Sequence, residues 1–514
     1  MLFKNKEKIL IFGTGSGGVN FFNSCRSRYR VVGFLDNNKQ KHGDKLLGLK
    51  IYSPQKLKEL SFDKIIIASD YYIDIHNQLV NQLMVNEEQV EVFHSGEAVF
   101  LSGWQLLKNK IYQYFIKLMC CQPGFLTSIL FHLFYGRWRG CNNIKAMPFD
   151  WLDRREDLCI HLFRPAIPDT VAGPAYIGRP QVMVDILLPE IALYRMKSTQ
   201  VCTVSRSFIL PDSRLLIERI ASSIKDDADY SGGHLLYHGK KLALVRKDSP
   251  ELIEKGILIS GRNEKNYYHW MLEVLSQLQF VNEMPDEFND YPILISAFSE
   301  KIESIRCFIE AANTGRDLIY LNGVSSYLVA DLLLISTPNN MIANSKGTAW
   351  SDVKNSYARS ESIEYLRQTA FKRCRHEQKF KNYKRIFLAR KGFIRHYNQN
   401  EIIDALEKFN FYSVYMEDLS FDEQVSLIAQ ADMIVGPTGA AWTNIIFAKS
   451  GAKALCWMAE EWGDLSCFSN LAFHVGVEMD YISYSAGTKE SRELYYQSYH
   501  LPIDDITSWV KARI

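Results

Sequence analysis

Short apolar runs alternate with helical segments along most of the chain. Near the N-terminus the runs fall at residues 8–12, 29–35, 64–68 and 90–93, and the first of them enters a glycine-rich corner. Apolar runs separated by helical segments are typical of strands buried in a parallel sheet. The pattern predicts a small α/β domain over residues 1–97.

The alternation returns at residue 150 and continues to the C-terminus. Strands are expected at 186–194 and 200–210, followed by a helix at 215–224. Further strands are predicted at 256–260, 292–296, 318–321, 332–336, 385–389, 411–415, 454–458 and 475–482, and helices at 266–278, 402–409 and near 491–514. Strands spaced by helices in this way are typical of an α/β domain.

The segment 431–448, ADMIVGPTGAAWTNIIFA, joins an apolar strand to a helix through Gly436-Pro437-Thr438-Gly439. Glycines and the small Ala440 let the backbone approach a ligand closely. The first turn of a helix also presents unpaired N–H groups and the positive end of its dipole. This corner is therefore a candidate phosphate or diphosphate site, although an ordinary strand-to-helix turn has the same pattern.

A second corner of this kind follows the strand at 8–12, where Gly13, Gly15 and Gly18 form a GxGxxG motif. Asp36 ends the next strand, near the offset of about 20 residues at which a carboxylate accepts hydrogen bonds from ribose hydroxyls. The domain is too short for two mononucleotide halves. The motif thus predicts one nucleotide-sized, Rossmann-like pocket, with a purely structural role as the alternative.

The composition narrows the class of protein. The chain has 514 residues, 47% of them hydrophobic and 23% charged, and a net charge of +2. We expect a soluble protein of two or three domains without a strong overall attraction to nucleic acid. The ten cysteines form no C-x-x-C pair, so neither a zinc ribbon nor a disulfide framework is indicated. No signal-like N-terminus or apolar run of roughly 20 residues is found, and a cytoplasmic location is expected.

Residues 98–149 contain no Asp or Glu but carry Lys and Arg among many aromatic side chains. Aromatic and basic residues together suit the headgroup layer of an anionic membrane leaflet. A helical linker whose apolar side packs on the next domain fits equally well. The sequence therefore leaves open whether this element contacts the inner face of the membrane.

Residues 266–278 predict a helix with Asn266 as its N-cap. Its buried stripe consists of Met271, Val274, Leu275 and Leu278. His269, Glu273 and Ser276 fall on another side. An imidazole and a carboxylate one turn apart are the groups needed for a general base and its orienting partner. A solvated surface pair has the same spacing and is the alternative.

Two other patterns are weak metal-site candidates. Asp227-Ala228-Asp229 is a DxD, but it follows a predicted helix instead of ending an apolar strand. His234 and His238 are four residues apart but flanked by glycines, where a helix is disfavoured, and both are expected in loops. We therefore assign no metal ligand.

A basic run at 371–395 is interleaved with aromatic residues and could be taken for a nucleic-acid patch. It contains the predicted strand 385–389, however, which ends at Arg390. Cations at the carboxyl end of a strand lie where an α/β sheet binds an anionic ligand. Arg390 is therefore a candidate for binding phosphate.

Five motifs follow one another in the second part of the chain. They are Asn266-Tyr267-Tyr268-His269-Trp270 with Glu273; Arg390 and Arg395; Asn400-Glu401; Leu419-Ser420-Phe421 with Gln424; and Gly436-Pro437-Thr438-Gly439-Ala440-Ala441 with Asn444. Their order and spacing resemble the family 61 glycosyltransferases, which include capsular polysaccharide biosynthesis proteins and O-linked N-acetylglucosaminyltransferases. The resemblance covers about residues 150–485. Thr438 departs from it, because the family often has histidine there, although a hydroxyl can still donate to a phosphate oxygen.

The segment 33–52, GFLDNNKQKHGDKLLGLKIY, resembles the N-terminal domain of sugar acyltransferases and of nucleotide-sugar-modifying enzymes of bacterial surface polysaccharide pathways. This second resemblance implies a UDP-sugar or a related nucleotide as ligand of residues 1–97.

The resemblance to family 61 implies a GT-B-like pair of lobes. We expect an acceptor lobe at 150–375 and a nucleotide-sugar donor lobe, with a closing helix, at 376–514. It also implies inversion at the anomeric carbon without an obligatory metal or other cofactor. The expected reaction moves a sugar from a nucleotide-sugar to a hydroxyl of a growing cell-surface polysaccharide or lipid-linked glycan.

In this interpretation either His269 or Glu273 is the base, and the other orients it. The donor-binding candidates are Arg390, Arg395, Gly436, Thr438, Gly439, Ala440 and Asn444. Two other functions remain open. One is a non-catalytic nucleotide-sugar-binding subunit of a polysaccharide assembly complex. The other is a nicotinamide-dependent sugar-modifying enzyme acting through residues 13–18.

Overall fold

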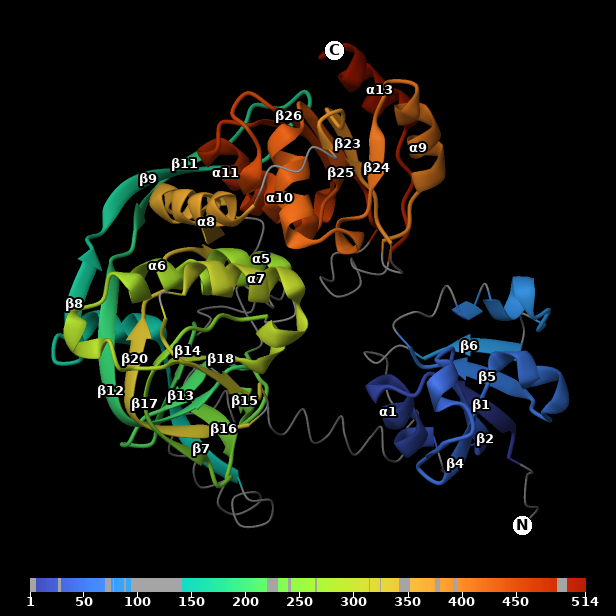
Figure 1. Ribbon diagram of the computed structural model, residues 1–514, viewed down its shortest axis with the longest axis horizontal. Coiled ribbons are helices and arrows are strands. Elements are labelled where there is room, and N and C mark those ends of the chain that lie inside the picture. Colours follow the sequence, from blue (N-terminus) through green and yellow to red (C-terminus); the bar gives the residue numbers. More distant parts are fainter. Residues whose placement is uncertain are drawn as a thin grey trace. The chain divides into compact units, whose positions relative to one another are not determined.

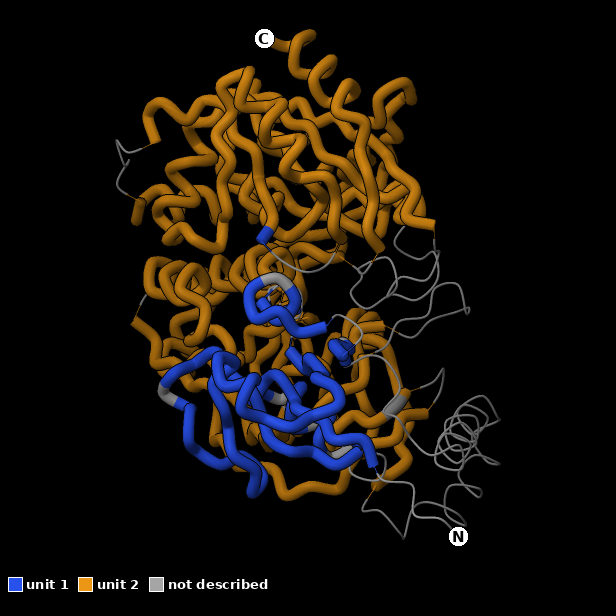
Figure 2. The backbone as a smooth tube through the Cα atoms, turned by 90° about the vertical axis from the view of Figure 1, so that its right-hand side faces the viewer, with its two compact units in different colours: residues 1–116, 391–394 blue, residues 117–390, 395–514 orange. Residues whose placement is uncertain are grey.

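The chain divides by its internal contacts into two compact units, residues 1–116 with 391–394 and residues 117–390 with 395–514 (Figure 2). The computed structural model describes residues 6–25, 29–69, 75–76, 78–86, 89–93, 141–219, 230–238, 242–263, 266–313, 315–323, 325–341, 352–374, 380–391, 395–487 and 497–514. Residues 98–140 of the predicted membrane-surface or linker element and Asp227-Ala228-Asp229 lie outside the described residues. The prediction is wrong for the end of that element, because Cys141–Pro148 is a strand paired on both sides within the second unit.

The first unit is built on a largely parallel sheet. Its described strands follow the order β3-β4-β2-β1-β5-β6 (Figure 1), with β3 and β4 antiparallel. The bounds are β1 Lys8–Phe12, β2 Arg30–Leu35, β3 Lys45–Leu46, β4 Leu49–Tyr52, β5 Lys64–Ile67, β6 Val90–Val92 and helix α1 Ser16–Cys25. Ile9 and Ile11 pack in one apolar cluster, and Leu10 and Phe12 in another. Both faces of the sheet are therefore covered, which is why its strands read as continuous apolar runs.

The second unit begins with a mixed sheet. Its described strands follow the order β15-β16-β7-β14-β13-β12-β20-β17-β18-β19, and β8 also pairs with β12. The bounds are β7 Cys141–Pro148, β8 Cys159–Arg164, β12 Ile191–Cys202, β13 Ser207–Ile209, β14 Arg214–Ile217, β15 Leu235–His238, β16 Leu242–Arg246, β17 Glu251–Leu258, β18 Ile293–Ser296, β19 Leu318–Leu321 and β20 Tyr327–Ile335. Two short ribbons are β9 Ile167–Ala172 with β11 Met183–Leu188, and β21 Asn340–Met341 with β22 Ser356–Tyr357.

A parallel sheet forms the rest of this unit, in the order β10-β27-β26-β25-β23-β24. Its strands are β10 Ala175–Tyr176, β23 Arg385–Leu388, β24 Tyr412–Val414, β25 Met433–Pro437, β26 Lys453–Ala459 and β27 Glu478–Tyr484. The helices of the unit include α5 Tyr267–His269, the π-helix η7 Trp270–Leu275, α6 Gln277–Asn282, α7 Glu303–Ala312, α8 Ser360–Arg373, α9 Gln399–Glu407, α10 Phe421–Gln430, the 3₁₀-helix η14 Ala440–Phe447, α11 Cys467–His474 and α13 Ile503–Lys511.

Helices fill the space between the two sheets of this unit (Figure 1). One apolar cluster runs from Ile257 of β17 through Met271 and Leu275 to Val435 of β25. The His269 helix is therefore fixed from both sides by packing. Among the described residues, no helix is both long and apolar enough to cross a membrane.

The helix predicted at 215–224 is wrong where the structure describes it, because Arg214–Ile217 is strand β14. Leu216 packs in one apolar cluster, and Leu215 and Ile217 pack in another. Alternate burial on two faces is the strand period, which a short apolar run does not reveal by itself. The prediction that His238 lies in a loop is also wrong. His238 is the last residue of strand β15, which pairs with β16. The strands predicted at 186–194 and 200–210 are each interrupted, the second by a turn at 203–206.

Candidate functional site

The helix that carries His269 begins as predicted. Asn266 is its N-cap, and its side-chain oxygen accepts a hydrogen bond from Tyr268 N at 2.9 Å. After His269 the helix widens into a π-helix over Trp270–Leu275 and then continues as α6. Single π turns within α-helices are frequent at functional sites.

His269 and Glu273 form a buried pair. Nδ1 of His269 lies 3.0 Å from Oε1 of Glu273, and the side chains are 3% and 1% exposed. The alternative of a solvated surface pair is therefore wrong. The same carboxylate oxygen accepts a hydrogen bond from Met341 N at 2.9 Å, which fixes Glu273 against β21.

The pair alters the protonation of the imidazole. Burial by itself lowers the pKa of His269, but the neighbouring Glu273 carboxylate, with a further contribution from Glu218, outweighs it and raises the pKa above its ordinary value. Glu273 therefore favours the imidazolium form, as a carboxylate beside a catalytic base does.

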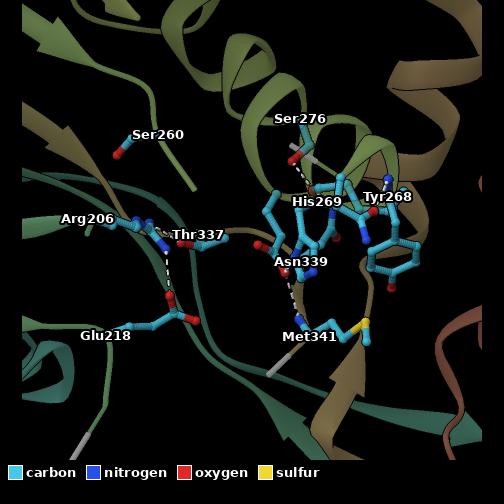
Figure 3. A network of polar contacts seen from close by, with 12 residues as sticks. Arg206, Glu218, Ser260, Tyr268, His269, Ser276, Thr337, Asn339 and Met341 are labelled. Carbon is cyan, nitrogen blue, oxygen red and sulfur yellow. Dashed lines mark hydrogen bonds and ion pairs between the residues drawn. The ribbon is translucent and has the colours of Figure 1, made fainter. Parts of the chain in front are cut away.

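The π-helix is held by Asn339 from another part of the chain and by side chains of its own C-terminal continuation, Ser276 and Gln277 (Figure 3). Leu272 O accepts hydrogen bonds from Asn339 Nδ2 at 2.7 Å and from Ser276 Oγ at 2.5 Å. Gln277 Nε2 donates to Ser260 O at 2.9 Å. Asn339 is fixed in turn, because its Oδ1 accepts from Arg359 N at 2.8 Å. Carbonyl groups are thus paired where the helix widens.

The predicted phosphate corner lies at the end of β25. Gly436 and Pro437 belong to the strand, and the helix begins at Ala440 as predicted, but as 3₁₀-helix η14. Thr438 O accepts a hydrogen bond from Arg390 Nη2 at 2.6 Å. A methyl group added at Gly439 would lie 2.9 Å from the same nitrogen. The glycine therefore makes room for the guanidinium, and the structure brings Arg390, Thr438, Gly439 and Ala440 together.

Gly436 has a packing role, because a Cβ there would lie 2.8 Å from the Cβ of Leu388. The Thr438 side chain is buried, and its hydroxyl has no hydrogen-bond partner within the described part of the chain. Arg395 follows β23 with a left-handed φ of +58°, and its guanidinium lies 5.0 Å from the centre of the Trp462 ring.

Asn444 connects this corner to the His269 helix. Its Oδ1 accepts a hydrogen bond from Tyr267 Oη at 2.9 Å, and its Nδ2 donates to Gln424 Oε1 at 3.1 Å. Helix α5 also packs against η14. The two parts of the predicted site are therefore neighbours, and the Asn444 amide holds them together.

The N-terminal corner places Gly13, Gly15, Gly18 and Asp36 around the end of β1. A Cβ at Gly18 would lie 2.0 Å from Gly13 O, whereas one at Gly15 meets nothing within 4 Å. The Asp36 carboxylate accepts hydrogen bonds from the Thr14 hydroxyl, from Lys41 Nζ at 3.0 Å and from Asn38 N at 2.8 Å. These bonds outweigh the effect of burial and lower the pKa of Asp36.

Two charged residues near the His269–Glu273 pair were missed in the sequence. Arg206 lies in the turn before β13 and Glu218 directly follows β14. They belong to no motif, and Glu218 was placed in a predicted helix. Only the pairing of distant strands brings them to this site. In the described ranges, no group of three or more His, Cys, Asp and Glu is placed to hold a metal ion.

Comparison with known proteins finds two matched segments in this chain. Residues 267–455 match the Glycosyltransferase 61 family. The matched segment covers less than half of the chain and includes His269, Glu273 and the corner from Arg390 to Asn444. The match supports a glycosyltransferase role. Residues 5–91 match a second family, described as C2185-like, N-terminal.

The search of curated proteins found no match. Among solved structures, the crystal structure of UDP-D-quinovosamine 4-dehydrogenase from Vibrio fischeri is similar at 23% identity over 21% of this chain and 87% of that chain. Its TM-score is 0.15, which is too low to support an inference.

Proposed function

We propose that this protein is an inverting glycosyltransferase that moves a sugar from a nucleotide-sugar to a hydroxyl of a growing cell-surface polysaccharide or lipid-linked glycan. The observation that carries the proposal is the buried His269–Glu273 pair within the Glycosyltransferase 61 match, on a helix hydrogen-bonded to the glycine corner. The same match does not favour a non-catalytic binding subunit.

In the proposed mechanism His269 is the general base. Its Nδ1 faces Glu273, so Nε2 takes the proton from the acceptor hydroxyl as that oxygen attacks the anomeric carbon. Glu273 is held by Met341 N, orients the ring and stabilises the imidazolium that forms. Base catalysis of this kind typically contributes about 10²- to 10⁴-fold.

The leaving nucleoside diphosphate carries the negative charge that the corner would stabilise. Arg390 lies against Thr438 there, and the first amide groups of η14 supply donors and the positive end of a helix dipole. Arg395 and the buried Thr438 hydroxyl are further donors in this scheme. No metal or other cofactor is required by this chemistry.

The remaining features complete the proposal. The two sheets of the second unit would act as acceptor and donor lobes of a GT-B-like enzyme, with limits near 150–375 and 376–514. Residues 1–97 would form a Rossmann-like domain that binds a nucleotide on the open side of Gly15, beside Asp36. Residues 98–140 would contact the inner face of the membrane from the cytoplasm, whereas residues 141–148 of the predicted element are strand β7 of the mixed sheet.

Turnover by the purified protein tests the proposal directly. Glu273→Gln should lower transfer from a nucleotide-sugar by about 10²- to 10⁴-fold, because it removes the group that orients the base, and donor affinity by calorimetry should stay unchanged. Glu283→Gln is a matched control, since this carboxylate at the end of α6 pairs with Arg164 at the surface. Transfer by Glu273→Gln at nearly the wild-type rate would remove the pair from the mechanism.

A further inference from the structure

Arg206 and Glu218 form a second charged pair within the network of Figure 3. Nη1 of Arg206 lies 3.9 Å from Oε2 of Glu218, and Nη2 donates a hydrogen bond to the Thr337 hydroxyl. The side chains are 3% and 10% exposed. Both residues lie outside the matched segment 267–455. The family match therefore does not include the Arg206–Glu218 pair, which lies beside the His269–Glu273 pair.

The backbone of Arg206 is held in an unfavourable conformation. Its φ is +43°, in the left-handed region that non-glycine residues seldom adopt. The guanidinium lies 5.1 Å from the centre of the Phe149 ring, which fixes it from a second side. Such strain persists only where the surroundings hold it, and it often accompanies a functional site. The turn thus places this cation in the interior, beside Glu218.

Glu218 belongs to the same electrostatic environment as the proposed catalytic pair. Burial raises the pKa of Glu218, and Arg206 acts in the opposite direction. Glu273 raises it further, whereas Arg262 and His269 lower it. Charges interact this way only over short distances in a protein interior. Glu218 therefore interacts electrostatically with His269 and Glu273, and Figure 3 draws Arg206, Glu218 and His269 in one network of polar contacts.

Several buried oxygen atoms of this part of the protein lack hydrogen-bond partners among the described residues. They are Oε2 of Glu218, Oε2 of Glu273, Oγ1 of Thr203 and Oγ of Ser260. Buried polar groups in proteins are nearly always paired, so each of these atoms calls for a partner that the described part of the chain does not supply. Two carboxylates and two hydroxyls thus have unused acceptor capacity among the described residues, and Nε of Arg206, in the pair with Glu218, is an unused donor.

The chemistry of these groups selects the kind of ligand. Carboxylate oxygens accept hydrogen bonds and repel an anion, so a phosphate or a carboxylate is disfavoured at this place. An apolar ligand would leave the oxygen atoms unpaired. A sugar presents several neighbouring hydroxyls, each of which can donate to an oxygen and accept from a hydroxyl or guanidinium group. A neutral, hydroxyl-rich ligand therefore fits best.

We propose that Glu218, held by Arg206, binds hydroxyl groups of the acceptor sugar and so determines which hydroxyl reaches His269. This inference rests on the proposed glycosyl transfer, which it deepens by naming the acceptor as a neutral pyranoside and Glu218 as its specificity-determining contact.

Glu218→Met tests the inference, because the thioether matches the length of the side chain but neither accepts as a carboxylate nor donates. The KM for the acceptor should rise at least about 10-fold, as for a site left with unpaired polar groups, while kcat and the affinity for the nucleotide-sugar change little. Asp212→Asn is the matched control, because Asp212 precedes the same strand β14 and pairs with Arg214 at the surface. Thermal melting checks the fold of each variant. Should Glu218→Met fail to fold, Glu218→Gln, which keeps a hydrogen-bonding group beside Arg206, replaces it with a smaller expected rise in KM.

Binding measured without turnover separates this inference from the proposed function. Saturation-transfer NMR with a panel of methyl pyranosides, in the presence of UDP or GDP, should show binding to the wild type that weakens in the variant. Loss of melting temperature or of donor affinity with an unchanged acceptor KM would show a structural role and overturn the inference. Absence of pyranoside binding to the wild type would also overturn it. Wild-type transfer with an unaltered acceptor KM in the variant would do so while leaving the glycosyltransferase proposal intact.

Discussion

The molecule contains two glycine-rich corners between a parallel strand and a helix, and they are built differently. In the N-terminal corner the glycines are required by neighbouring backbone atoms. A Cβ at Gly13 would lie 2.7 Å from Ala68 O, and a Cβ at Gly18 would lie 2.0 Å from Gly13 O. In the C-terminal corner Gly439 leaves room for a side chain, the guanidinium group of Arg390. The first corner is fixed by main-chain packing, and the second is shaped around a cation.

The polar residues of the two corners also differ, in how far they are hydrogen-bonded within the described chain. Asp36 is satisfied within its own unit by Thr14, Lys41 and Asn38. Thr438 keeps a buried hydroxyl without a partner in the described chain, beside an arginine that binds its carbonyl oxygen. A glycine motif alone therefore does not distinguish a structural turn from an anion site. The nearby charges differ, so substituting Gly18 should affect folding of the N-terminal unit, and substituting Arg390 should affect binding at the C-terminal corner.

The largest effect is expected from Gly18→Ala. Its new methyl group would meet a backbone oxygen that no rotamer change can move, so the N-terminal unit should lose about 3 kcal/mol or more of its free energy of unfolding. Gly15→Ala is the matched control, because its Cβ meets open space. Calorimetry of the full chain measures both. Equal melting temperatures would show that this corner is not fixed by its backbone contacts.

Arg390→Ala should act on binding instead. Loss of a charge-assisted hydrogen bond to phosphate is worth about 1.5–3 kcal/mol, so the Kd for a nucleoside diphosphate should rise roughly 10- to 100-fold. Arg385→Ala removes the same charge from the other end of β23 and serves as the control. Titration calorimetry on both variants decides. An unchanged Kd for Arg390→Ala would take Arg390 out of the site.

Gly439→Ala is a milder test of the same corner. The backbone at Gly439 is extended, with φ 169°, so alanine adopts it without strain, and the methyl group displaces only the end of a flexible arginine. We expect a roughly 3- to 10-fold weaker Kd with a stability change below about 1 kcal/mol. Added to Arg390→Ala, the substitution should have no further effect on binding. Additive effects would show that Gly439 does not act through Arg390.

The smallest effect is expected at Asp36. Its lowered pKa means that the ionised form stabilises the folded N-terminal unit above the ordinary value of 3.8, and that this contribution is lost as pH falls through the pKa in the folded state. Asp36→Asn should therefore lower stability by up to about 1 kcal/mol at pH 7, and this deficit should shrink as pH falls below 3.8. Melting curves across pH, with the exposed Asp44→Asn as control, measure the difference. A deficit that stays the same as pH falls below 3.8 would contradict the assigned cause.

Much of the fold was predictable because burial on both faces makes parallel strands continuous apolar runs. The strand at 8–12, the strand at 318–321 and the start of η14 at Ala440 agree with the structure residue for residue. Local capping chemistry likewise located Asn266. The order of the motifs predicted that the His269 helix lies close to the glycine corner. In the structure the hydrogen bond from Tyr267 to Asn444 connects the two.

What the sequence did not show depends on partners far away along the chain. Leu215 and Ile217 fit a helix or a strand until β7 and β13 pair with them. The burial of His269 and Glu273 depends on β21 and on packing from both sheets, so a local pattern could not exclude a solvated pair. Glu218 joins the site only through strand order. Its role is invisible to any motif.

The π turn at Trp270–Leu275 has a consequence for related chains. Such a turn holds one residue more than a regular helical turn, and each residue rotates a helix by about 100° about its axis. Deleting a single position there would swing His269 round the axis relative to Gln277 and the residues that follow. A homologue without this spacer could keep the histidine and the glutamate facing each other one turn apart and still present the pair on a different side of the helix relative to Gln277.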